Sequence, residues 1–422
     1  MQKHIAIYLL LLSLFLSFKV ATNRGFAEEL SLVPQTLNIR TSGYPVPHFL
    51  LKALAYDAVT REISKRKLPH IIMLKDKISA FDFLSPAETT LIDVPVLLKN
   101  GSKRKIKHIY VIAKNEDLGE REDDYLMISN DPEVIPRQGI LFQGHLRNWE
   151  SARLLYYHTA PSDESYDVVT SIHNPSKWPI EVFASVGLGG PSNDGIYAGH
   201  VATLRFMNRL KYKAGRIIKI PPKSSYKLIH QRLSPATRTG TAIAKIWLVS
   251  GAKAKIEIKA QKPGTRPSNL PVIDCSWDDG RISYFVPSSS IDIKRDFDTR
   301  NERLDIRIGE EPVFVTPKRG FDIHLGNYGL LHRIRLKLIN HGENETHNLD
   351  LLYTAKGGLA RGVFLINGEL YDTDLLDAQE NKSEKILSVS IPPKTSKILE
   401  ILLMPQPGSF YPTLLSVVNK HK

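Results

Sequence analysis

The sequence predicts a mainly β protein, with two tandem antiparallel β-sandwich domains after a small amino-terminal domain of α+β or β type. Three observations support this fold class. The chain has 422 residues, more than one hydrophobic core usually spans. Its content of 42% hydrophobic and 24% charged residues is that of an ordinary globular protein. Short blocks of sequence recur in the same order in both halves of the chain, which predicts two copies of one domain.

The amino terminus has the layout of a secretory signal peptide. Lys3 precedes an apolar run at residues 5–18, which is shorter than the roughly 20 residues of a membrane-spanning helix. Gly25 and Ala27 are small residues at the two positions that a signal peptidase recognises, which favours cleavage after Ala27. We therefore expect an exported protein, either periplasmic or extracellular. The alternative is an uncleaved anchor, because Lys19 and Arg24 follow the run. No other stretch reaches 18 apolar residues, and no transmembrane span is expected in the mature chain.

Residues 28–120 are expected to form the small amino-terminal domain. Apolar residues at helical spacing predict one amphipathic helix over residues 49–63. Two apolar runs, at residues 93–98 and 105–113, flank Asn100 and Gly101, a dipeptide that is a strong hairpin signal.

The internal repeat places the first sandwich at residues 125–258 and the second at residues 304–420. Its closest match is Ile-Pro-Pro-Lys-Ser-Ser at residues 220–225, which returns as Ile-Pro-Pro-Lys-Thr-Ser at residues 391–396. The offset between matched blocks drifts, as insertions in surface loops would make it do. The other matches are residues 131–139 with 311–320, residues 145–149 with 324–328, residues 172–175 with 338–341, and Gly189-Gly190 with Gly357-Gly358.

Period-two alternation between turn residues predicts the strands of each copy. Residues 166–173 alternate before an Asn-Pro turn, and residues 330–339 alternate before a His-Gly turn. Strands at such spacing favour an antiparallel sandwich, and residues 259–303 between the copies are expected to be a linker or edge-covering segment. In architecture the copies resemble the immunoglobulin-like modules of exported envelope proteins, a likeness carried by strand spacing and by the Asn-Pro and Pro-Pro turns.

The chain is basic, with a formal net charge of +13. Removal of residues 1–27 leaves 54 basic against 44 acidic residues, a net charge of +10, which predicts attraction to polyanions. The strongest patch is Lys103, Arg104, Lys105 and Lys107, which could bind an anionic envelope polymer. The alternative is a solvated hairpin tip whose lysines protect an edge strand. No interleaved aromatic pattern accompanies the patch, so no specific nucleic-acid partner is expected.

A glycine-rich segment at residues 187–195 precedes a short helix expected at about residues 197–211. Backbone amides at Gly189 and Gly190 could hold an anion at the start of that helix. The Gly-Lys-Ser/Thr ending of a phosphate loop is missing, so a structural turn is the alternative. In the second copy the corresponding candidate residues are Gly357, Gly358 and Arg361.

Three further features of the sequence contain residue types that can carry chemistry. His145 and His324 match in the repeat, but neither has partners at metal-ligand spacing, so no metal is predicted. The acids of residues 274–279 beside Trp277 fit a sugar-hydrolysing or sugar-binding site, or a hairpin turn. The lone Cys275 allows no intramolecular disulfide and has no identifiable catalytic partner.

These observations favour an exported, non-catalytic β-sandwich protein that binds an anionic polymer or another protein at the cell envelope. A carbohydrate-active hydrolase remains one alternative, although no catalytic residue and no cofactor is predicted. A periplasmic chaperone that offers an edge strand to a client is another, and the charges along residues 330–339 argue against it.

Overall fold

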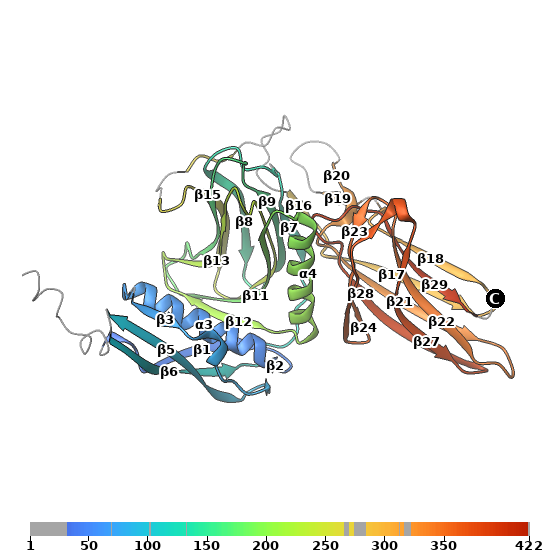
Figure 1. Ribbon diagram of the computed structural model, residues 1–422, viewed down its shortest axis with the longest axis horizontal. Coiled ribbons are helices and arrows are strands. Elements are labelled where there is room, and N and C mark those ends of the chain that lie inside the picture. Colours follow the sequence, from blue (N-terminus) through green and yellow to red (C-terminus); the bar gives the residue numbers. More distant parts are fainter. Residues whose placement is uncertain are drawn as a thin grey trace, which may run out of the picture. The chain divides into compact units, whose positions relative to one another are not determined.

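The computed structural model describes residues 32–68, 70–100, 103–131, 133–265, 270–273, 284–311, 313–315 and 322–420. The predicted signal peptide, the acidic segment at residues 274–279 and Cys275 lie outside these residues. The chain is mainly β, with two α-helices in its described part, and it divides into two compact units at Leu118 and Gly119 (Figure 1).

The first unit is a four-stranded sheet with one helix packed on it (Figure 1). In sheet order its strands are β1 (Thr36–Ser42), β6 (Lys103–Asn115), β5 (Thr89–Asn100) and β3 (Ile71–Met73). Helix α3 (His48–Lys65) buries a face that includes Leu50, Leu54 and Val59. A small ladder joins β2 (Val46–Pro47) to β4 (Phe83–Leu84). The helix and the β5–β6 hairpin predicted from the sequence are both confirmed.

The first sandwich of the second unit has two sheets around one core. Its first sheet runs β16 (Tyr284–Val286), β7 (Tyr125–Ser129), β9 (Ser151–Thr159), β14 (Thr239–Ser250), β11 (Ile180–Ser192), β12 (Gly215–Ile220). Its second sheet runs β13 (Ser225–Leu233), β10 (Tyr166–His173), β15 (Lys253–Gln261), β8 (Gly139–Arg147). Buried side chains from both sheets, such as Tyr156, Leu248, Phe142 and Ile256, fill the space between them.

Helix α4 (Gly195–Lys211) packs against β11 and β14 of the first sheet. The side chain of Asp194 accepts a hydrogen bond from the Tyr197 backbone N–H at 2.9 Å, which caps the helix. The helix is two residues longer at its start than the sequence predicts because this cap lies directly after β11.

The second sandwich also has two sheets. One runs β18 (Arg303–Ile308), β29 (Thr413–Asn419), β22 (His347–Ala355), β27 (Ser383–Ile391). The other runs β17 (Ser290–Asp298), β21 (Leu331–Asn340), β28 (Thr395–Leu403), β24 (Val363–Ile366), β25 (Glu369–Asp372). Two small ladders pair β19 (Val313–Val315) with β20 (Asp322–His324) and β23 (Leu359–Ala360) with β26 (Leu376–Asp377). Short 3-10 turns lie at Lys75–Lys77, Leu325–Asn327 and Ala378–Glu380.

The two sandwiches share one strand order. The order β9-β14-β11-β12 of the first corresponds to β18-β29-β22-β27 of the second, and the pair β13-β10 corresponds to β28-β21. In the first sandwich β15 lies between β10 and β8, antiparallel to both, so β8 is parallel to β10. In the second sandwich β17 pairs directly and in parallel with β21. Strand β17 is therefore the counterpart of β8, and β15 is an additional strand of the first copy.

This correspondence corrects two predictions. The segment at residues 259–303 is not a linker throughout, because residues 290–298 form β17 inside the second sandwich. Five of the nine residues of β17 are charged, so its sequence lacks the sustained alternation of apolar and polar residues that predicts a strand. The matched blocks at residues 145–149 and 324–328 are not equivalent, since His145 lies on β8 whereas His324 ends the small strand β20.

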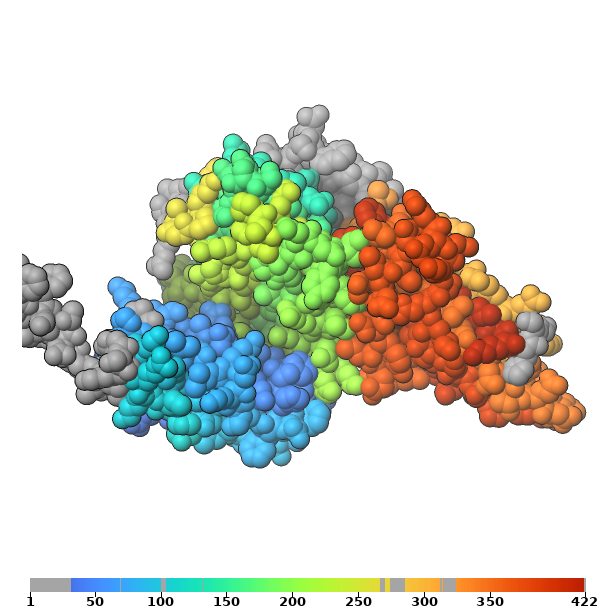
Figure 2. Space-filling model, viewed as in Figure 1, coloured from blue at the N-terminus to red at the C-terminus, as the bar shows by residue number. Residues whose placement is uncertain are grey.

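The two sandwiches of this unit are joined by a third apolar core. Phe206 and Met207 of α4 are buried in one cluster with Leu331, Val363 and other side chains of the second sandwich. Figure 2 shows the surface of the α4 segment, in green, adjoining the second sandwich, in orange. Burial of this kind fixes the helix between the two copies.

Candidate functional site

The predicted basic patch lies on β6, and its described cations are not all on one face of that strand. Successive residues of a strand point to opposite faces, so Arg104 lies on one face of β6 and Lys105 and Lys107 lie on the other. The Lys107 ammonium donates to the Val33 carbonyl at 2.8 Å, and burial, together with the charge of Lys105, lowers its pKa. The side chain of Lys103 lies outside the described part of the chain. Of the cations whose side chains are described, Arg104 is therefore separated from Lys105 and Lys107 by the strand.

Gly189 and Gly190 are in a strand rather than in a loop. Both belong to β11, and only Asn193 and Asp194 separate that strand from α4. A Cβ atom at Gly189 would overlap the Ala198 carbonyl oxygen of the helix. The expectation of a loop over residues 187–195 is thus wrong for residues 187–192, which belong to the strand. A glycine is needed at position 189 because the helix backbone lies close to the strand there. Anion binding by their amides stays a prediction.

Gly357 and Gly358 have a different surrounding. They form the turn after β22, where a Cβ atom at Gly357 would overlap the Tyr411 carbonyl oxygen. Arg361 follows β23, and its carbonyl accepts a hydrogen bond from the Gln406 side chain. The two glycine pairs that match in sequence therefore do not form one repeated local structure, and their role in ligand binding also stays a prediction.

The two histidines that match in sequence have opposite environments. His324 is 3% exposed, its Nε2 lies 2.8 Å from the Tyr328 carbonyl oxygen, and burial lowers its pKa to about 4. His145 is exposed on the outer face of β8, where burial and the charges of Lys253 and Lys255 lower its pKa. Within the described ranges, no three His, Cys, Asp or Glu side chains are placed to hold a metal ion.

A basic surface that was not predicted lies on the outer side of the sheet β13-β10-β15-β8. The inward side chains of β15, including Ile256 and Ile258, are fully buried, so Lys253, Lys255 and Lys259 point outward. The strand registers place the other cations of the four strands on the same side. We call this surface the basic face; its members are Arg147, Lys227, Arg232, Lys253, Lys255, Lys259, His145, His173 and His230.

Two carboxylates lie among these cations. Glu257, which is 4% exposed, contacts Lys259 Nζ at 2.7 Å, Lys255 Nζ at 2.9 Å and His173 Nε2 at 3.4 Å. Burial alone would raise the pKa of Glu257, but the contacts from His173, Lys259 and Lys255 outweigh it and hold the pKa well below its usual value. Glu257 therefore stays ionised and orders two lysines at the centre of the face.

The second carboxylate, Asp167, is held in a similar way. Arg232 Nε lies 2.8 Å from Asp167 Oδ1 and His230 Nε2 lies 3.3 Å from it. Burial opposes ionisation, but the bonds from Arg232 and His230 lower the pKa of Asp167 overall. Six Lys and Arg thus face two carboxylates on these four strands, which leaves an excess of positive charge.

Arg147 and Lys253 are the most available cations of the face. They lie opposite each other on β8 and β15, both are exposed, and no carboxylate of the described chain pairs with either side chain. The sequence Lys-Ala-Lys-Ile-Glu-Ile-Lys of β15, with a cation at three of four alternate positions, was the local signal that could have indicated this face.

No protein-family model and no curated protein sequence matches this chain. Among solved structures, the chain is similar to the N-terminal CBM22-1–CBM22-2 tandem domain of Xyn10C from Paenibacillus barcinonensis. The two share 8% sequence identity, and the match covers 68% of this chain and 98% of that chain. The TM-score is 0.15, so the backbones superpose poorly and the similarity carries no argument about function. Of the helices in the described ranges, none is both long and apolar enough to cross a bilayer.

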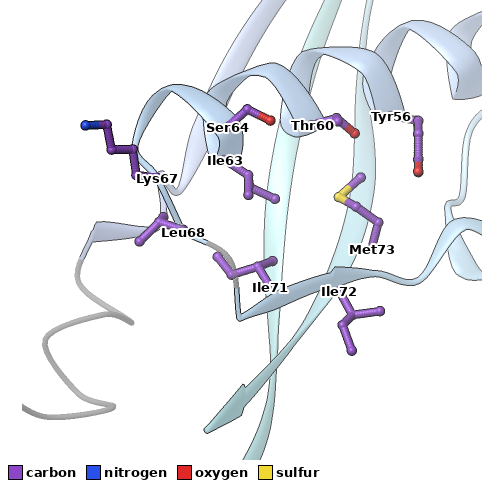
Figure 3. Close-up of a pocket in the computed structure, with 9 residues that line it drawn as sticks. All are labelled: Tyr56, Thr60, Ile63, Ser64, Lys67, Leu68, Ile71, Ile72 and Met73. Carbon is purple, nitrogen blue, oxygen red and sulfur yellow. The ribbon is translucent and has the colours of Figure 1, made fainter. Parts of the chain in front are cut away.

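The first unit has a cavity of about 640 Å³ between α3 and β3 (Figure 3). Tyr56, Thr60 and Ser64 follow one side of the helix, and Ile71 and Met73 of the edge strand point toward it (Figure 3). These walls are mostly apolar, with hydroxyl groups along one side, so the cavity is chemically unlike the basic face.

Proposed function

We propose that this protein is exported and binds an anionic polymer at the cell envelope through the basic face of its first sandwich. The observation that carries the proposal is the excess of six Lys and Arg over two carboxylates on one four-stranded sheet. Because both carboxylates are already bonded to cations of the face, they do not present free negative charge to a ligand.

The geometry of a sheet suits an extended polymer. Neighbouring strands lie roughly 4.8 Å apart, so cations on adjacent strands present positive charge in rows across the surface. A chain with repeated negative groups can contact several of them at once and release bound counterions. Such binding needs no enclosed pocket and weakens steeply with salt.

The second sandwich provides an internal comparison. Its corresponding strands β17, β21 and β28 carry six Lys and Arg but four carboxylates. Arg333 lies opposite Asp292 there, and Lys337 lies opposite Asp296. Positive and negative side chains alternate on this sheet, so the proposal assigns the polymer to the first sandwich alone.

Export rests on the amino-terminal sequence. The cation, apolar run and small residues up to Ala27 have the layout of a signal peptide. An envelope location would bring a basic protein into contact with polyanionic polymers. Amino-terminal sequencing of the protein recovered from its native host tests this part, since cleavage predicts that the chain begins at Glu28, and a chain that retains Met1 would overturn it.

Polymer binding is tested with dextran sulfate against neutral dextran, each at about 50 mM and about 200 mM salt. We expect binding to dextran sulfate alone, with an affinity that falls at the higher salt concentration. Equal binding to both polymers, or binding to neither, would overturn the proposal.

Two double variants locate the site. Arg147→Gln with Lys253→Gln removes two exposed cations of the basic face, and Lys294→Gln with Arg335→Gln removes an opposed pair from the second sandwich. We expect roughly a tenfold loss of affinity in the first case, since each exposed ion pair contributes up to about 1 kcal/mol. The control should bind within about twofold of the wild type. An equal loss in both would mean that binding follows net charge and not this face.

A further inference from the structure

Three arginines of the first sandwich lie close together at the end of α4. Arg205 and Arg209 are four residues apart on the helix, so they share one face of it. The Ala214 backbone N–H donates to the Arg209 carbonyl at 3.0 Å, and Arg216 follows directly on β12. Arg209 is half-buried; burial is the main cause that lowers its pKa to about 10, and the charges of Arg216 and Arg205 add to it.

Protein groups orient two of the three guanidinium groups. Arg205 Nη1 donates to the Leu188 carbonyl at 2.6 Å, on a part of β11 that extends beyond its pairing with β12. Arg216 donates to the Tyr226 hydroxyl, and its guanidinium lies 5.9 Å from the centroid of the Tyr226 ring. These two side chains are thus held in place beside Arg209.

Arg209 has no such partner. Its side chain makes no hydrogen bond or ion pair with any residue that the structure describes, and Arg205 likewise has no carboxylate partner there. Arg209 lies in the last turn of α4, where the helix dipole favours a cation by only about 0.3–1 kcal/mol. Arg209 is half-buried, and partial removal of a guanidinium from water without a counter-charge is unfavourable.

We propose that Arg205, Arg209 and Arg216 form a binding site for a tetrahedral oxyanion of the phosphate or sulfate class. A guanidinium group has five N–H donors in a planar fork, which fits two oxygens of such an anion at once. Arg209 supplies the donors that the protein leaves unused, and Arg205 and Arg216 add positive charge from the helix and the strand. The anion provides the counter-charge that Arg209 lacks. The inference does not depend on polymer binding by the basic face.

The site is tested by titrating the full chain with inorganic phosphate and inorganic sulfate, against chloride at matched ionic strength. We expect saturable binding of the tetrahedral anions and none of chloride. Arg209→Gln should weaken phosphate binding at least about tenfold, because it removes charge-assisted hydrogen bonds. Arg205→Gln, at an exposed position, should weaken binding in the same direction. Phosphate binding no stronger than chloride binding, or an unchanged affinity in Arg209→Gln, would overturn the site.

Stability separates a binding role from a structural one. Without phosphate, Arg209→Gln should unfold at the same temperature as the wild type or higher, because it removes a half-buried charge that no carboxylate of the described chain compensates. With phosphate, only the wild type should gain thermal stability. A lower melting temperature of Arg209→Gln in chloride alone would show that Arg209 stabilises the fold directly and would overturn the proposal.

Two further comparisons complete the test. The basic-face variant Arg147→Gln with Lys253→Gln should bind inorganic phosphate as the wild type does, and an equal loss there would show unspecific attraction and overturn the site. Glycerol phosphate distinguishes the source of the anion. If the ester binds as well as the free ion, the site accepts a phosphate group on a larger molecule; if only inorganic phosphate binds, the site holds the free ion.

Discussion

Asn174 and Asn340 hold the same turn in the two sandwiches. The side-chain amide of each donates at 3.0 Å to the carbonyl of the isoleucine before a Pro-Pro turn, Ile220 in the first sandwich and Ile391 in the second. The amide oxygen of each accepts a hydrogen bond at 2.9 Å from the backbone N–H two residues further on. Both side chains are almost fully buried, so each asparagine ties the end of one strand to the start of the turn.

Replacement of either asparagine by alanine should destabilise its sandwich. Asn174→Ala and Asn340→Ala each leave buried backbone groups without partners, which lowers the free energy of unfolding by about 2–3 kcal/mol. Urea denaturation followed by far-UV circular dichroism measures the change in both variants. Asn148→Ala, at an exposed asparagine of the β8–β9 turn, is the control and should stay within about 0.5 kcal/mol of the wild type. Equal stability of Asn174→Ala and Asn148→Ala would contradict the assigned role.

The same contacts explain which parts of the fold were predictable. Each asparagine bonds the isoleucine carbonyl before a Pro-Pro turn, and the blocks that contain these turns are the closest match of the repeat. Strand β17 was missed because its two buried side chains, Ile293 and Phe297, are separated by charged residues. Period-two alternation predicted β10 and β21 because one face of each strand is buried.

The basic face was missed for a different reason. Arg147, Arg232 and Lys253 are far apart in the sequence and become neighbours only through the pairing of β8, β10, β13 and β15. By contrast, Arg104 and its sequence neighbour Lys105 point to opposite faces of one strand. Charged residues that are neighbours in a strand sequence thus point to opposite faces of the sheet. Charged residues that are distant in the sequence can lie side by side when their strands pair.

A buried ion pair at the junction of the two sandwiches should be important for stability. Arg153 Nη2 lies 2.8 Å from Asp123 Oδ2, and Arg153 Nη1 donates to the carbonyls of Ser289 and Gly329. Arg153→Met leaves the Asp123 carboxylate and both carbonyls without this partner, and should lower the free energy of unfolding by about 3–5 kcal/mol. Chemical denaturation measures this free energy. The double variant Arg153→Met with Asp123→Asn should recover part of the stability that Arg153→Met loses. If the effects of the two single substitutions simply add, the pair is not coupled.

Two buried histidines predict a loss of stability in mild acid. Burial lowers the pKa of His324 and of His332 to about 4, against about 6.5 in an unfolded chain. Between about pH 6.5 and pH 4 the unfolded state therefore binds protons that the folded state does not. The free energy of unfolding should fall by about 1.4 kcal/mol for each histidine per pH unit across this window.

Denaturation at several pH values measures this slope, and His332→Gln should remove one histidine's share of it. Acidic groups act at lower pH: Arg300 is the main cause that lowers the pKa of Asp298 to about 2, so stability from that carboxylate is lost only below about pH 4. An unchanged slope between pH 6.5 and pH 4 in His332→Gln would contradict its neutral, buried state.

The close approach of α4 to β11 predicts that Gly189 tolerates no side chain. A Cβ atom there would overlap the Ala198 carbonyl oxygen and lie 2.8 Å from the Ala202 backbone nitrogen, and helix backbone cannot move aside as a side chain could. Gly189→Ala should therefore lower the free energy of unfolding by about 3 kcal/mol or more. In Gly264→Ala the new Cβ atom has no neighbour within 4 Å, and the backbone angle φ of +77° should account for a loss of only about 1–2 kcal/mol. Thermal unfolding compares the two variants. Since α4 also packs against the second sandwich, Gly189→Ala should also expose the helix to proteolysis. Equal stability of Gly189→Ala and Gly264→Ala would show that the helix lies further from β11 than this packing requires.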